Sequence, residues 1–160
     1  MTSEQLSLFG KPVKKKTVML VRLKCVKEDS GVYSSCITNS QDVLELVKPI
    51  FDGSYCELVV IVCLSNINKT NAVSIVNIGS VCQSMVSPGN VFKTVLTTNS
   101  RSFIMIHNHP GGSLVPSSAD KEITERLKKG GELLEIDLLD HLILNLDCTA
   151  HYSFKEHNLI

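Results

Sequence analysis

The feature that most constrains how this chain can fold is a pair of histidines at the end of an apolar run, followed by a turn and a helix start. His107 and His109 follow the apolar residues 103–106, and side chains two positions apart on a strand point to the same side. Ser117 and Asp120 come next, after a segment with two prolines and two glycines. Such a segment lets the chain reverse, so that the helix start can meet the strand end.

Brought together, these side chains would form a ligand set for a divalent metal ion. Two neutral imidazole nitrogens from His107 and His109 and a carboxylate oxygen from Asp120 suit Zn²⁺. Three protein ligands leave a fourth position open, which is typical of a catalytic rather than a structural zinc site. The sequence therefore predicts one zinc ion per chain.

Each part of this pattern also has a simpler interpretation. A serine with an acidic residue three positions later, just after a proline, is a signature of a helix start, where both side chains satisfy free backbone N–H groups. A His-x-His pair on an apolar strand is more often a hydrogen-bonded structural pair. All four residues at this spacing favour the metal site, and Ser117 can both cap the helix and face a reaction centre.

The composition is that of one globular domain. The chain has 160 residues, of which 43% are hydrophobic and 20% charged, and its formal net charge is zero. These values exclude a disordered chain and give no overall basic signal for nucleic acid. No apolar run reaches the ~20 residues of a membrane span, and the N-terminus does not resemble a signal peptide. Six cysteines without a Cys-x-x-Cys pair fit a reduced, cytoplasmic protein.

Hydrophobic periodicity predicts strands that alternate with three helices. The predicted strands are residues 17–26, 55–64, 70–78, 102–107, 138–144 and 150–154. The first helix is capped by Ser40, and the third covers residues 117–129 and ends at Gly130 and Gly131. The second helix begins at Pro88 and is expected to bury Val91, Phe92, Val95 and Leu96.

This order of elements predicts an α/β (α+β) fold, a mixed β-sheet flanked by helices on both faces. We expect one domain over residues 17–160, preceded by a flexible tail over residues 1–16.

Glu57 is the one charged residue in the apolar run 55–64. A carboxylate beside a buried strand is costly unless it has a partner. One interpretation is the general base that a zinc-water mechanism needs, which takes a proton from the water and passes it to the leaving group. The other is an exposed first turn of the strand, where the carboxylate costs little.

The spacing of His107, His109, Ser117 and Asp120 resembles the motif of the JAMM (MPN+) metalloproteases, whose remaining member is a glutamate on an upstream strand. Separate segments within residues 40–160 are more closely similar, and in the same order, to the RadC family of JAB/JAMM domains. These segments are His107-Asn-His-Pro-Gly-Gly, Pro116-Ser, Gly131-Glu-Leu-Leu, Leu139-Asp-His and Tyr152-Ser-Phe. The family usually has a serine where this chain has Gly111.

The resemblance implies a JAMM/cytidine-deaminase-like fold with one zinc ion held by His107, His109 and Asp120. Glu57 would be the general acid/base that accepts the proton of a zinc-activated water. Ser117 would stabilise the oxyanion of the tetrahedral intermediate.

Asp140 and His141 also match the RadC family. The match allows a position behind the metal ligands, for example a carboxylate that orients an imidazole ligand. A surface turn or a local hydrogen bond is the alternative interpretation.

The implied activity is that of a zinc-dependent hydrolase, a peptidase or isopeptidase acting on a peptide or protein substrate. The alternative is a non-catalytic, DNA-associated accessory protein of DNA repair or replication. The helix-hairpin-helix region of full-length RadC proteins has no counterpart in this sequence, which leaves DNA binding through such a region open. A nucleobase deaminase is excluded because its zinc set requires a Cys-x-x-Cys pair.

A short segment near the N-terminus carries a second resemblance. Gln5, Leu6, Ser7, Leu8 and Phe9 are similar to the peptide by which many bacterial proteins bind the DNA polymerase sliding clamp. Leucine and phenylalanine on a free tail can fill the pockets of such a groove. An amphipathic start that packs on its own domain is the other interpretation, so the sequence leaves a sliding-clamp partner open.

Overall fold

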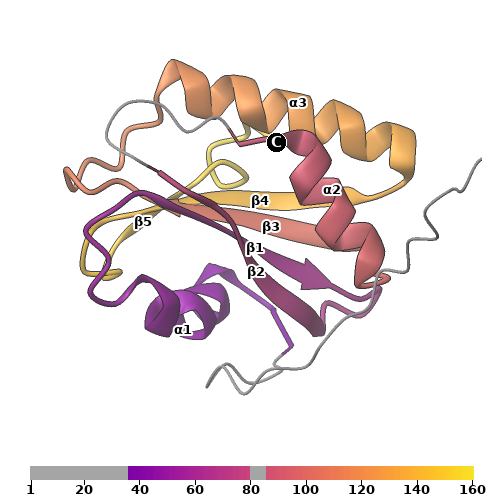
Figure 1. Cartoon of the computed structure of the whole chain (residues 1–160), viewed down its shortest axis with the longest axis horizontal. Helices are drawn as coiled ribbons and strands as arrows, with labels where there is room; N and C mark the ends of the chain where they lie inside the picture. Colours follow the sequence, from indigo (N-terminus) through magenta and orange to yellow (C-terminus); the bar gives the residue numbers. More distant parts are fainter. Residues whose placement is uncertain (1–35, 80–85) are drawn as a thin grey trace, which may run out of the picture.

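A five-stranded mixed sheet organises the part of the chain that the structure describes (Figure 1). The structure is a computed structural model and describes residues 36–79 and 86–160. The elements are, in chain order, α1 (Ser40–Phe51), β1 (Leu58–Leu64), β2 (Thr70–Ile78), α2 (Pro88–Thr97), β3 (Ser102–Asn108), α3 (Ser118–Leu134), β4 (Asp137–Leu144) and β5 (His151–Ser153). The strands lie in the order β2-β1-β3-β4-β5, with β3 and β4 parallel and the other neighbours antiparallel.

Helices cover both faces of the sheet, as the sequence predicts. In Figure 1, α1 lies below the sheet and α3 lies above it, while α2 runs from beside α3 down the right side of the strands. Val60 and Val62 of β1 pack in the core cluster that includes residues of α1. Val59 and Ile61 pack in the cluster that includes residues of α2 and α3. Every residue of β1 and β3 is buried, because both faces of these central strands are covered.

The strand predicted over residues 55–64 is shorter than expected, since β1 begins at Leu58. Leu58 pairs with Ile78, which is the last residue of β2. The residues before Leu58 therefore have no residue of β2 opposite them. Tyr55 is 88% exposed. Glu57 therefore lies just before the strand rather than inside it.

The prediction that α3 ends at Gly130 and Gly131 is wrong, because the helix continues to Leu134. Both glycines are needed for close packing. A Cβ at Gly130 would lie 2.7 Å from Cε2 of Phe92, and a Cβ at Gly131 would overlap the backbone oxygen of Ile136. The helix ends instead at its C-cap Glu135, which adopts a left-handed conformation with φ of 55°.

Two smaller predictions also need correction. The cap of α1 is Asn39 rather than Ser40, and its side chain accepts a hydrogen bond from the backbone N–H of Asp42. Leu96 is 57% exposed, although it was expected on the inner side of α2. It follows the buried Val95 directly, at the edge of the stripe that faces the sheet.

Several predictions fall outside the described residues. These are the strand over residues 17–26, the tail over residues 1–16 and the clamp-like peptide at residues 5–9, which all stay predictions. Within the described ranges, no helix has the length and apolar character needed to cross a membrane.

Candidate metal centre

The centre begins at the end of β3, the middle strand of the sheet. His107 pairs with Val59 of β1 on one side and with Ile143 of β4 on the other. Phe103 and Met105, four and two residues earlier, pack in the core cluster that includes residues of α2 and α3. Strand alternation directs His107 to the same face, and its side chain is 3% exposed.

A tight turn places the second histidine. The backbone N–H of Gly112 donates to the carbonyl of His109 at 2.8 Å, and Gly112 itself has a positive φ of 76° that favours glycine. The chain then returns so that the carbonyl oxygen of Ser113 lies 2.7 Å from Nδ1 of His109. A carbonyl only accepts, so Nδ1 carries the proton and the lone pair of Nε2 is free.

The start of α3 supplies the third side chain. The Ser117 hydroxyl donates to Oδ2 of Asp120 at 2.6 Å, and the Ser117 backbone N–H donates to the same oxygen at 2.7 Å. The backbone N–H of Asp120 in turn donates to the Ser117 hydroxyl oxygen at 3.1 Å, which completes a capping box. Ser117 and Asp120 therefore cap the helix, as the simpler interpretation predicts. Asp120 also lies beside both histidines, as a metal site requires.

The local environment keeps Asp120 ionised. Burial by itself raises the pKa of this carboxyl, but the hydrogen bond and charge of His107 and the hydrogen bonds of Ser117 outweigh it. The pKa of Asp120 consequently lies well below its usual range. The carboxylate also sits in the first turn of α3, where the helix dipole favours negative charge.

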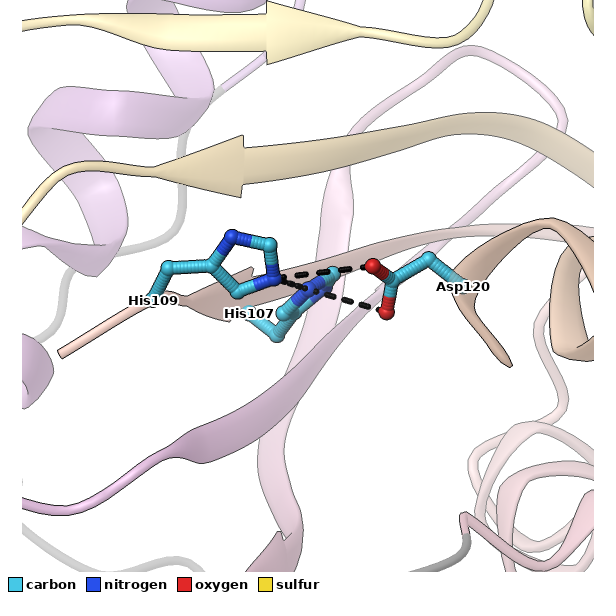
Figure 2. A group of neighbouring side chains, drawn as sticks. All are labelled: His107, His109 and Asp120. Carbon is cyan, nitrogen blue, oxygen red and sulfur yellow. Dashed lines mark hydrogen bonds and ion pairs between the residues drawn. The ribbon is translucent and has the colours of Figure 1, made fainter. Parts of the chain in front are cut away.

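The three side chains converge on one point, as Figure 2 shows. Nε2 of His107 lies 3.0 Å from Nε2 of His109 and 3.2 Å from Oδ1 of Asp120. Nε2 of His109 lies 3.5 Å from Oδ2 of Asp120. Atoms bound to zinc at about 2.0–2.1 Å in tetrahedral geometry lie roughly 3.3–3.4 Å apart. The spacing of these donors therefore fits a small divalent ion, and this buried group can hold a metal.

A second layer of buried polar side chains lies behind His107. Nδ1 of His107 lies 2.8 Å from Nε2 of His141, whose Nδ1 lies 2.6 Å from the Thr124 hydroxyl. That hydroxyl donates to the carbonyl of Asp120 at 2.6 Å. Burial, and after it the charge of His107, lower the pKa of His141 well below its usual value, so this ring is neutral.

Asp140, for which the resemblance allowed a position behind the ligands beside the alternative of a local hydrogen bond, is engaged elsewhere. Its carboxylate accepts hydrogen bonds from the backbone N–H groups of His141 and Lys155 at 2.7 and 3.0 Å and from the Ser153 hydroxyl at 2.6 Å. It lines a cavity of about 450 Å³ beside α1, on the face of the sheet away from the metal centre. The carboxylate thus holds the C-terminal segment in place rather than an imidazole ring.

Asn108, between the two histidines, links β3 to the residues that precede β1. Its side chain is buried, accepts from the backbone N–H of Leu58 at 2.7 Å and donates to the carbonyl of Cys56 at 3.1 Å. These two bonds hold the backbone on both sides of Glu57. No sequence pattern indicates this role of Asn108, because its partners lie about 50 residues away.

Glu57 lies at the edge of the centre. It stands two residues before Val59, the cross-strand partner of His107. Its carbonyl accepts from the backbone N–H of Gly79 at 2.7 Å. Among the described residues, the donor atoms within 4.8 Å of one another belong to the two histidines and Asp120, without Glu57.

Comparison with known proteins shows the family of this chain. A model of the RadC-like JAB domain matches residues 37–159. The chain belongs to this family. A UPF0758 protein of Chlorobaculum parvum is 36% identical over 124 residues, which cover 78% of this chain and 55% of that relative. A UPF0758 protein of Methanosarcina barkeri is 41% identical over 108 residues, which cover 68% and 47% of the two chains.

This chain spans about half the length of the curated UPF0758 relatives that it matches. The range matched by the RadC-like JAB model nevertheless includes the whole candidate centre, from Glu57 to His141. Family membership and the fold thus agree with the resemblance found in the sequence.

Proposed function

We propose that this protein is a zinc-dependent hydrolase of JAMM type that cleaves an amide bond in a peptide or protein. The observation that carries this proposal is the convergence of three donors at near-tetrahedral spacing. Nδ1 of His107 and Nδ1 of His109 both have partners on the outer side of the cluster, so both Nε2 atoms are directed inward.

His107, His109 and Asp120 would hold the ion. When bound, zinc would act as a Lewis acid, which polarises a carbonyl and makes water more acidic. With the ion bound, Asp120 would contribute one negative charge and the two rings would be neutral donors. The His109 side chain is 20% exposed, whereas His107 is 3% exposed, so we expect substrate to approach from the side of His109.

Glu57 would accept a proton at its carboxylate and return it to the leaving amine. Two observations support this role. Glu57 directly precedes β1, which pairs with β3, and the two hydrogen bonds of Asn108 hold the backbone on either side of it. Ser117 would stabilise the oxyanion. Its hydroxyl donates to Asp120 in this structure, so it would have to turn that donor toward the substrate.

The first experiment is the metal content of the purified chain, prepared without chelator or a histidine tag. We expect about one zinc per chain in the wild type and its loss in Asp120→Ala. Asp137→Ala, which removes an exposed carboxylate outside the centre, is the control and should keep the metal. A wild-type chain that holds no metal, even after zinc is supplied, would contradict the proposal and leave Ser117 and Asp120 with the role of a helix cap alone.

The second experiment separates chemistry from metal binding. Glu57→Gln should keep its zinc and lower the cleavage of a peptide library prepared from digested bacterial proteins by about 10²–10⁴-fold. Mass spectrometry of the products measures this rate. A zinc-loaded wild type that cleaves no faster than Glu57→Gln would favour the alternative, a DNA-associated accessory recruited to the sliding clamp through residues 5–9.

A further inference from the structure

A continuous chain of buried hydrogen bonds connects two of the candidate ligands behind the metal centre. It starts at Nδ1 of His107, passes through both nitrogens of His141 and the hydroxyl of Thr124, and ends at the backbone carbonyl of Asp120. Thr124 is 2% exposed and His141 is fully buried. No bulk water competes for these groups, so each proton in the chain must have a partner within it.

The chain permits two arrangements of its protons. In the first, Nδ1–H of His107 donates to His141, and Nδ1–H of His141 donates to Thr124, whose hydroxyl donates to the Asp120 carbonyl. In the second, Nε2–H of His141 donates to Nδ1 of His107, and the Thr124 hydroxyl donates to Nδ1 of His141 instead of to the Asp120 carbonyl. The proton of His107 then lies on Nε2. Only the first arrangement leaves the Nε2 lone pair of His107 free for a metal ion.

The Thr124 hydroxyl distinguishes the two arrangements. In the first it accepts from His141 and donates to the Asp120 carbonyl, which the structure places 2.6 Å away. In the second its single proton goes to His141 and the bond to Asp120 is lost. A hydroxyl can accept and donate at once, so it completes one more hydrogen bond in the first arrangement.

The ring of His141 is held against rotation. It stacks on Phe154, with ring centroids 4.4 Å apart and an interplanar angle of 18°. A flip would also place carbon atoms where the two nitrogens lie and lose both hydrogen bonds, so the proton position decides which nitrogen of His107 is free.

We propose that Thr124 is a positioning residue that, through His141, selects the tautomer of His107 able to bind metal. This inference rests on the proposed function, because it assigns the ion to Nε2 of His107. Removing the hydroxyl would leave the Nδ1–H of His141 without an acceptor in a dry interior. The metal-binding arrangement then loses two hydrogen bonds, to His141 and to the Asp120 carbonyl, whereas the other arrangement loses one, so zinc affinity falls.

The test compares zinc affinities of the full chain by chelator competition. Thr124→Val keeps the shape and removes the hydroxyl, and we expect roughly 10–100-fold weaker zinc binding. Thr124→Ser keeps the hydroxyl and should bind zinc within a few-fold of the wild type. Thr94→Val is the matched control, since Thr94 makes the same kind of bond to a carbonyl four residues earlier, at 3.1 Å, without a histidine partner.

A second readout is the proton position in the zinc-loaded wild type, from long-range ¹H–¹⁵N NMR of the histidine rings. We expect the proton of His141 on Nδ1, and a proton on Nε2 would overturn the inference. Equal zinc affinities of wild type and Thr124→Val would overturn it as well, as would an equal loss in Thr124→Ser. A wild-type chain that binds no zinc would overturn the proposed function together with it.

Discussion

At the scale of single residues, Asp120 and Asp140 show how similar burial serves different purposes. Both are 9% exposed. The carboxylate of Asp120 lies against two histidine nitrogens and the hydroxyl of Ser117. Among the described residues, the carboxylate of Asp140 accepts from the Ser153 hydroxyl, from the Lys155 backbone N–H and from the adjacent backbone N–H of His141. Burial of a carboxylate therefore identifies a site only once its partners are known.

This contrast predicts that one amide variant loses stability and the other loses zinc affinity. Asp140→Asn should lower the free energy of unfolding by about 2 kcal/mol, because an NH₂ group would replace an acceptor of several hydrogen bonds. Its zinc content should not change. Asp120→Asn should lose zinc affinity because it removes the charge at the centre. Urea unfolding in the presence of chelator and metal analysis measure the two effects, and loss of zinc in Asp140→Asn would contradict our assignment.

At the scale of elements, α3 is shaped by close contacts rather than by its intrinsic helix propensity. Glycine lowers helix stability by about 1 kcal/mol relative to alanine, yet α3 contains two adjacent glycines and continues past them. Gly130 lets the helix approach Phe92 of α2. Gly131 lets the chain turn back, so that the N–H of Ile136 reaches its carbonyl at 2.9 Å.

Gly131→Ala should therefore destabilise the protein although alanine is the better helix former. The added Cβ would overlap the backbone oxygen of Ile136, which cannot move aside as a side chain can. We expect a loss of about 2 kcal/mol of unfolding free energy, measured in urea. Gly111→Ala is the control, since a Cβ there has no neighbour within 4 Å. Equal stability of the two variants would contradict the close-packing explanation.

At the scale of the whole molecule, the candidate centre joins the middle of the sheet to the helix that covers it. His107 belongs to β3 and Asp120 to α3, so an ion between them would cross-link two elements. The unfolded chain does not hold these donors together. Bound metal therefore adds its binding free energy to the stability of the fold.

Removal of metal should accordingly lower the melting temperature. At a zinc concentration about 100 times its dissociation constant, binding adds about 2.7 kcal/mol, which is roughly 5–10 °C for a domain of this size. Calorimetry with and without chelator measures the shift. Asp120→Ala should show none, and an unchanged wild-type melting temperature would contradict metal binding in the folded state.

Much of the candidate centre could be predicted because its determinants are local in sequence. Two histidines at a strand end, a turn with a positive-φ glycine and a helix cap lie within fourteen residues, from His107 to Asp120. Period and spacing define such units without knowledge of the rest of the fold. The central strands were predictable for the same reason, since continuous apolar runs indicate burial on both faces.

The sequence by itself thus determined the ligand types, their order and the family resemblance. Only the tertiary structure decided which side chains stand behind the ligands. Thr124 meets His141 across 17 residues of sequence, and His107 meets His141 across 34. These contacts depend on the parallel register of β3 and β4 and on the depth at which α3 packs. Such distances are set by the packing of whole elements, which local periodicity does not encode.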